Sequence, residues 1–197
     1  MKKYLVFILL IWGYTKVYSM DIVDTYIDDA DVDRDSEQIV QLFQNDIDLL
    51  FHTPDQFKPE YVRWEIENKR VHDIWPVKEE DYEPPFYQKV LRKNEDLIGI
   101  ISYIIATDSG RLKKTFGEQG KEGWLWQLSV NSTFRRKGYA QKMLGYSLEH
   151  LKQLGVETVR VFVRNYNESC LSLCQKLGFE SYQTISNINA SLLKKKL

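Results

Sequence analysis

The stretch that most constrains the fold of this chain runs from Trp124 to Ala140, where a strand pattern gives way to a helical one. Most residues up to Val130 are aromatic or aliphatic, which favours a largely buried strand. The short polar residues 131–133 then end the strand, because their side chains bond to nearby backbone groups. The following helix presents small or apolar residues on one face: Ala140, Met143, Leu144, Ser147, Leu148 and Leu151.

A second strand pattern at 157–163 follows this helix and Gly155, a C-cap glycine. A strand, a helix and another strand in that order predict parallel pairing with a right-handed crossover. A ligand is expected where the two strands meet at their carboxyl ends.

The turn before the helix has the composition of an anion-binding loop. Arg135, Arg136 and Lys137 supply positive charge, and Gly138 lets the backbone approach a ligand. The first N–H groups of a helix lack partners within it, and the helix dipole adds positive charge there. The spacing alone fits a phosphate site and a solvated basic loop equally well.

The stretch Arg135-Arg136-Lys137-Gly138-Tyr139-Ala140 resembles the Gln/Arg-x-x-Gly-x-Gly/Ala signature of the GCN5-related N-acetyltransferases, the GNAT superfamily. Residues 167–179 are similar to a second family segment, Asn-x-x-Ala-x-x-Leu-Tyr-x-Lys-x-Gly-Phe. Two motifs in this order and at this separation are far more specific than either one alone. The resemblance covers a domain at residues 21–197.

The resemblance implies an α/β fold with a mixed sheet of about six or seven strands and about four helices, whose central parallel strands splay apart. It implies acetyl-CoA as acyl donor, with an amine of a small molecule or protein as acceptor. Residues Arg135 to Ala140 would hold the pyrophosphate, Leu128 and Val130 would offer backbone groups to the pantetheine arm, and Asn167 would lie near the cofactor.

The sequence departs from the family at Cys174, where a tyrosine usually protonates the coenzyme A thiolate. A thiol is shorter and a weak donor. Either Cys174 substitutes, or a tyrosine does so, or the thiolate leaves unaided; the tyrosines are Tyr139, Tyr166 and Tyr182. The general base is unassigned, because Trp124 stands where some members carry glutamate, and Glu122 lies nearby with unknown direction.

Two hypotheses follow for the function. One is an acetyl-CoA-dependent N-acetyltransferase, which the basic turn favours. The other is a GNAT-fold domain that binds coenzyme A or a protein partner with weak or no turnover, which the missing tyrosine favours. Either form could be a monomer or a homodimer.

The composition indicates the size of the domain and the kinds of molecule that it could bind. With 197 residues, 43% of them hydrophobic, the chain fits one domain with a full core. A formal net charge of −1 argues against broad attraction to nucleic acid.

We expect no metal site, because the acidic run 28–35 lacks the glycine and closing glutamate of an EF-hand. We expect the aspartates of this run to cap a helix. Cys170 and Cys174 lie four apart on an apolar stripe and are expected to be buried thiols.

The first residues have the pattern of a secretory signal peptide at 1–19, with a basic start, a continuously apolar centre and a small residue at Ser19. Export is therefore expected, without stable membrane association after cleavage. An uncleaved anchor, a buried first strand, and a cytoplasmic protein that starts at Met20 remain as alternatives. Export also raises the question of how the protein would meet acetyl-CoA.

Periodicity predicts the remaining elements. Strands are expected at 21–27, 86–92, 97–106, 124–130, 157–163, 180–186 and 190–197, and helices at 36–51, 59–71, from 140 and from 168 to 178. Residues 93–96 are expected to form a hairpin turn. Residues 72–85 and 107–123 are expected to be irregular, the former a candidate lining of the acceptor site.

Overall fold

The computed structural model describes residues 25–45, 82–106, 117 and 119–197. Within them, seven strands form one sheet in the order β1-β2-β3-β4-β5-β7-β6. The strands are β1 (Thr25–Asp29), β2 (Tyr82–Lys93), β3 (Asp96–Ala106), β4 (Glu122–Val130), β5 (Thr158–Arg164), β6 (Glu180–Ile185) and β7 (Ala190–Lys196). The helices are α1 (Val32–Asn45), α5 (Tyr139–Gln153) and α6 (Glu168–Lys176), with short 3-10 turns η4 (Ser132–Phe134) and η5 (Ser186–Ile188).

The predicted α/β fold class is confirmed. The sheet is mixed, because β4 and β5 pair in parallel whereas all other neighbours pair antiparallel. The strand–helix–strand unit around the basic turn therefore has the expected parallel pairing. The helix predicted at 59–71 and the N-terminal segment 1–19 lie outside the described residues.

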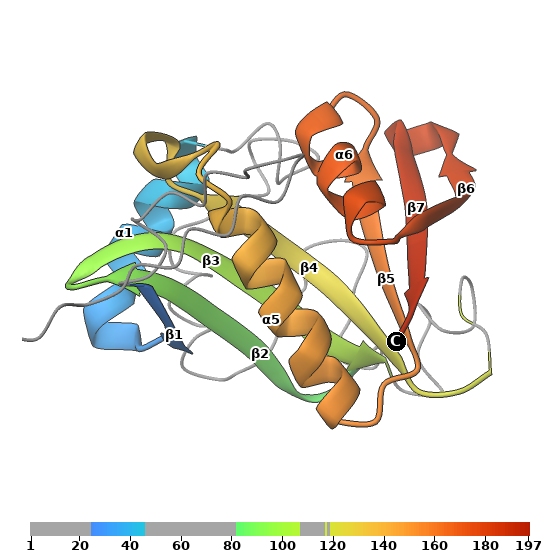
Figure 1. The fold of residues 1–197 in the computed structure, drawn as a ribbon, viewed down its shortest axis with the longest axis horizontal. Helices are drawn as coiled ribbons and strands as arrows, with labels where there is room; N and C mark the ends of the chain where they lie inside the picture. The colour runs from blue at the N-terminus through green and yellow to red at the C-terminus, as the bar shows by residue number, and fades with distance from the viewer. Residues whose placement is uncertain (1–24, 46–81, 107–116, 118) are drawn as a thin grey trace, which may run out of the picture.

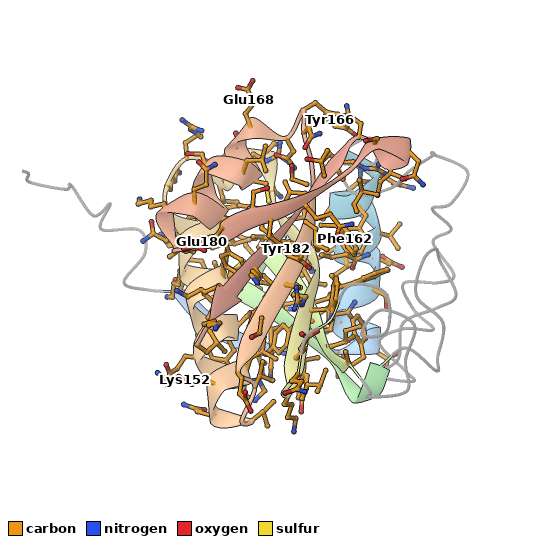
Figure 2. The ribbon with its side chains drawn as sticks, turned by 90° about the vertical axis from the view of Figure 1, so that its right-hand side faces the viewer. Lys152, Phe162, Tyr166, Glu168, Glu180 and Tyr182 are labelled. Carbon is orange, nitrogen blue, oxygen red and sulfur yellow. The ribbon has the colours of Figure 1, made fainter. Side chains whose placement is uncertain are left out.

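Two layers of helices cover opposite faces of the sheet (Figures 1 and 2). On one face, α5 buries the predicted stripe, including Met143, Leu144 and Leu151, against β3, β4 and β5. On the other face, α1 packs Ile39, Leu42 and Phe43 against β2 and β3. We call these faces the α5 face and the α1 face.

Helix α1 begins four residues before the predicted start, at Val32 rather than Ser36. The Asp31 carboxylate accepts hydrogen bonds from the backbone N–H groups of Asp33 and Arg34. This is the expected capping role of the acidic run, moved upstream. Asp35 is fully buried and pairs with Arg92 of β2, so part of the acidic run ties α1 to the sheet.

Two predicted irregular segments are partly strand. Residues 82–85 belong to β2, and the register with β3 shifts between Glu83 and Tyr87, across Pro84 and Pro85. Proline cannot donate to a sheet ladder, which explains the irregular pairing. Glu122 and Gly123 likewise belong to β4, which begins two residues before Trp124. The hairpin at 93–96 is confirmed, with Asn94 in the left-handed conformation at φ 55°.

Gly99 marks a close approach between layers. A Cβ atom at this position would lie 2.6 Å from the Ser129 carbonyl oxygen of β4 and 3.1 Å from the Met143 sulfur of α5. Only glycine lets β3, β4 and α5 meet at this distance.

A histidine is enclosed by tyrosines where α5 crosses β2 and β3. The Tyr103 hydroxyl and His150 Nδ1 are 2.8 Å apart, and Tyr103 is fully buried. The rings of Tyr87 and Tyr146 lie 5.0 and 6.2 Å from the His150 ring. Burial, reinforced by the charge of Lys89, lowers the pKa of His150, whereas Asp29 acts in the opposite direction. Burial and the charge of Lys89 thus both favour the neutral form of His150.

Candidate functional site

The two parallel strands part before they end. β4 and β5 pair only from Glu122 with Thr158 to Leu125 with Val161. β4 then continues to Val130 along β3, and β5 continues to Arg164 along β7. Figure 1 shows the two strands together near the C-terminus of the chain and apart toward α6.

A β-bulge at Trp126 accompanies the parting. Ser102 of β3 pairs with Gln127, but Tyr103 pairs with Leu125, so Trp126 is an extra residue in β4. A bulge bends its strand and increases the local twist. Because the bulge directly follows the last residue paired with β5, it explains why β4 turns away there. Leu128 and Val130, the residues predicted to offer backbone groups, lie beyond it with their side chains packed toward the α5 face.

The segment after β4 is a folded turn. The Asn131 side chain accepts a hydrogen bond from the Thr133 backbone N–H and caps η4. Arg135 Nε donates to the Val130 carbonyl oxygen at 2.8 Å, so this side chain fastens the turn to the end of β4.

Left-handed backbone shapes the rest of the turn. Arg136 has φ 63° and Gly138 has φ 87°. Left-handed residues in a turn aim successive backbone N–H groups to one side, as in anion-binding loops. The Lys137 ammonium lies 5.6 Å from the centre of the Phe134 ring, and the residues 135–138 are all exposed.

The N-terminus of α5 differs from those of the other two described α-helices. α1 is capped by Asp31 and has Asp33 and Asp35 in its first turn. α6 is capped by the Asn167 side chain and carries Glu168. By contrast, α5 has Gly138 as its N-cap, no side-chain cap and no acidic residue in its first turn. A helix start with these properties favours an external anion.

The next two predicted residues are covered. Tyr139 is 1% exposed and its ring packs edge-on to Phe134 at 6.3 Å, whereas Ala140 is half-buried. At these positions the backbone, and not the side chain, is the part that could contact a ligand.

Helix α6 lies beside the start of α5. The Asn167 side chain accepts from the Cys170 backbone N–H at 3.2 Å, and Lys176 Nζ donates to the Gln141 side-chain oxygen at 2.9 Å. Cys174 is 1% exposed, and Cys170 is half-buried rather than fully buried as expected. The hydrogen bond between the two thiols lowers the pKa of Cys170, and the same bond together with burial raises the pKa of Cys174.

A buried ion pair on the α1 face was not predicted from the sequence. Arg160 of β5 and Glu122 of β4 are both fully buried, with Arg160 Nη2 2.8 Å from Glu122 Oε1. Arg160 Nη1 also donates to the hydroxyl of Tyr182 on β6. The sequence signal was slight: Arg160 stands in the apolar strand predicted at 157–163, and Glu122 stands just before the strand predicted at 124–130.

Aromatic side chains flank this pair. The Trp124 and Phe162 rings lie 5.3 Å apart, and Trp126 packs against the same cluster. The three candidate tyrosines differ in exposure: Tyr139 is 1% exposed, Tyr182 36% and Tyr166 54%. Figure 2 labels Phe162, Tyr166 and Tyr182 in the view toward β6.

The described part of the chain offers neither a metal cluster nor a membrane-spanning helix. No group of three or more His, Cys, Asp or Glu side chains is placed to hold a metal ion there. None of the helices within the same residues is long and apolar enough to cross a membrane.

Comparison with known proteins gives the family. Residues 48–179 match the model of the acetyltransferase (GNAT) family, and the chain belongs to that family. The family uses acetyl-CoA as acyl donor. A search among curated proteins finds no match.

Three solved structures illustrate the similarity of this fold to known proteins. Ribosomal-protein-alanine N-acetyltransferase from Brucella melitensis has a TM-score of 0.67 at 17% identity, over 87% of this chain and 99% of that one. Arabidopsis thaliana NAA60 in complex with acetyl-CoA has a TM-score of 0.64 at 13% identity, over 88% and 98%. The PaiA N-acetyltransferase from Thermoplasma acidophilum in complex with coenzyme A has a TM-score of 0.60 at 16% identity, over 88% and 99%.

Proposed function

We propose that this protein transfers the acetyl group of acetyl-CoA to an amine of an acceptor, either a small molecule or a protein. The observation that carries the proposal is the start of α5, which has a glycine cap, no acidic residue and three cationic residues before it. Family membership and the parting of β4 from β5 next to this helix start support the same assignment.

Each part of the site has a role in the proposal. The backbone N–H groups of residues 138–140, with Arg136 and Lys137, bind the pyrophosphate, while Arg135 holds the turn to β4. The backbone of Leu128 and Val130 faces the pantetheine arm, and Asn167 orders the neighbouring start of α6. Acetyl-CoA supplies an activated acyl group, and the acceptor amine attacks it directly.

Cys174 is a poor proton donor in this arrangement. Its thiol is buried and hydrogen-bonded to Cys170, and its pKa is raised, so it holds its proton more tightly than a free cysteine. We infer that the coenzyme A thiolate leaves without a proton from Cys174.

Gly138→Glu tests the donor site. The new side chain would be strained at φ 87° and would place negative charge at the anion site. Calorimetry should detect acetyl-CoA binding to the wild type and at least a tenfold weaker affinity for the variant. Gly145→Glu is the matched control: it adds the same charge to the same helix at a position where an added Cβ would meet no atom within 4 Å. Equal affinities in all three proteins would refute the placement of the donor.

A second function remains supported by one observation. A buried cysteine replaces the usual catalytic tyrosine, as expected of a domain that binds coenzyme A without turnover. A thiol-release assay with a polyamine, an aminoglycoside, an amino acid and a peptide with a free N-terminus separates the two functions. Binding without release across such a panel would favour the non-catalytic domain.

We also propose that the protein is exported and that residues 1–19 are removed, on the basis of the signal-peptide pattern alone. N-terminal sequencing of the protein from its natural source tests this. A mature protein that begins at Met1 would contradict cleavage. Removal of residues 1–19 and translation from Met20 both leave Met20 as the first residue, so fractionation into exported and cytoplasmic protein decides between these two.

A further inference from the structure

The acceptor amine needs a group that takes its proton, since an ammonium ion has no lone pair with which to attack. Neither the residue at the position where some family members carry glutamate nor the nearby glutamate can serve as this base. Trp124 cannot accept a proton, and Glu122 is fully buried and engaged with Arg160.

We place the acceptor on the α1 face of the parted strands, because the α5 face is covered by helices. On the α5 face, α5 and α6 pack against β4 and β5 in one continuous apolar cluster that includes Cys174 and Val163. The polar and titratable side chains next to the parting on the α1 face therefore decide the proton transfer.

Tyr182 is the titratable group that the structure brings to this place. Arg160 donates a hydrogen bond to the Tyr182 hydroxyl. Arg160 directly precedes Val161, the last residue of β5 that pairs with β4, and one residue spans about 3.3 Å along a strand. Tyr182 is 36% exposed, so solvent and acceptor can reach it. Tyr139, by contrast, is buried in the core.

Positive charge surrounds the Tyr182 ring. Arg160 Cζ and Lys194 Nζ each lie 5.0 Å from the ring centre. Charged groups that contact Tyr182 include Arg160 on β5 and Lys194 on β7, and Glu122 of β4 lies behind Arg160. The two cations stabilise negative charge on the phenol oxygen and disfavour a charged ammonium beside it.

We propose that Tyr182 is the general base that accepts the proton of the acceptor amine, and that Arg160 is the positioning residue that holds its hydroxyl. The inference rests on the proposed acetyltransferase function. The ionised phenol oxygen takes one proton from the ammonium, and the neutral amine nitrogen bonds to the acetyl carbon. The carbon–sulfur bond breaks, and its electron pair leaves with the coenzyme A thiolate. The second proton of the nitrogen goes to solvent or to that thiolate, and the tyrosine returns its own proton to solvent.

Tyr182→Phe is the decisive variant, because it removes the hydroxyl and keeps the ring between the two cations. We expect kcat to fall on the order of 100-fold, an unchanged KM for acetyl-CoA, and loss of the acidic limb of the kcat pH profile. Tyr26→Phe is the matched control, since this tyrosine is exposed and lies on β1, at the opposite edge of the sheet from β6. Arg160 itself is a poor test site, because replacing it would leave the Glu122 carboxylate buried without its cation.

A second readout does not depend on turnover. In protein with isotope-labelled tyrosine, the NMR signal missing from Tyr182→Phe should shift when an amine from the four-compound panel is added in the presence of coenzyme A. The signal of Tyr26, on the opposite edge of the sheet, should not move. Full activity of Tyr182→Phe would overturn the proposal. If the wild type binds acetyl-CoA but acetylates no amine, the proposed function fails, and a Tyr182 signal unmoved by every amine overturns this inference as well.

Discussion

The proposed donor and acceptor sides of the parted strands β4 and β5 differ in the groups that form them, backbone on one side and side chains on the other. The donor side, from Trp126 to Ala140, is made of backbone: a bulge, two left-handed residues and a helix start without a side-chain cap. The acceptor side is made of side chains from four strands, with Glu122, Arg160, Tyr182 and Lys194 meeting on the α1 face. In the proposed mechanism, the donor side depends mainly on backbone conformation, whereas the acceptor side depends on the charge and hydrogen bonding of its side chains.

This difference predicts how each side tolerates change. A backbone site fails when the chain cannot adopt its conformation, and it is little affected by a change in neighbouring side chains. A buried ionic site fails when one partner is lost, because a charge is then left in a medium of low dielectric. Three measurements of stability break or sharpen this contrast.

The largest effect is expected on the acceptor side. Glu122→Ala removes the carboxylate opposite a fully buried guanidinium, and we expect a loss of about 3–5 kcal/mol in the free energy of unfolding. Urea denaturation measures it. The control is Asp29→Ala, which breaks the ion pair with Lys89 at 2.7 Å; because the Asp29 side chain is 69% exposed, its loss should cost at most about 1 kcal/mol. Similar losses in both variants would remove the distinction between buried and exposed pairs.

An intermediate effect is expected where β3 approaches the donor side. Gly99→Ala places a Cβ 2.6 Å from the Ser129 carbonyl oxygen, and the resulting shift of packed strands should cost about 1–3 kcal/mol. Gly145→Ala on α5 meets nothing within 4 Å and should stabilise the helix by up to about 1 kcal/mol. The same urea titration compares them. A neutral Gly99→Ala would mean that β3, β4 and α5 can separate without cost.

The smallest effect concerns His150, which belongs to neither side. Its pKa is lowered in the folded protein, so the unfolded chain binds a proton more readily. The stability that His150 contributes is therefore present above its ordinary pKa of 6.5 and is lost as the pH falls through the lower, folded value. The urea midpoint of His150→Gln should decline less between pH 7.5 and 5 than that of the wild type. Parallel declines would show that His150 does not titrate as the structure implies.

The donor side was largely predictable from the sequence. Turn residues, helix starts and apolar periodicity are local signals, and Gly138, Asn167 and the stripe of α5 all lie where the sequence analysis expected them. The start of α1 was misjudged by four residues, because the acidic run has two functions: Asp31 caps the helix, while Asp35 pairs with Arg92 across 57 positions of sequence.

The acceptor side was not predictable by the same means. Glu122 and Arg160 are 38 positions apart, and Tyr182 follows 22 positions later. Their meeting depends on the register of β4 against β5 and on the insertion of β7 between β5 and β6. Neither follows from periodicity, which places a residue on a face but not beside a particular partner. The bulge at Trp126 has no local sequence signal for the same reason.

The short pairing between β4 and β5 has a mechanical consequence. The sheet consists of two blocks, β1 to β4 and β5 with β7 and β6, joined along their shared seam by only the four residue pairs from Glu122–Thr158 to Leu125–Val161. A ligand with amide groups that lay between the unpaired parts of β4 and β5 could form hydrogen bonds with both blocks. Bound acetyl-CoA would then connect the two blocks and stabilise the folded sheet. At 100 times its Kd it would raise the free energy of unfolding by about 2.7 kcal/mol. We expect acetyl-CoA to slow amide hydrogen exchange at residues 126–130 of β4 and 162–164 of β5 in parallel. These two segments do not pair with each other.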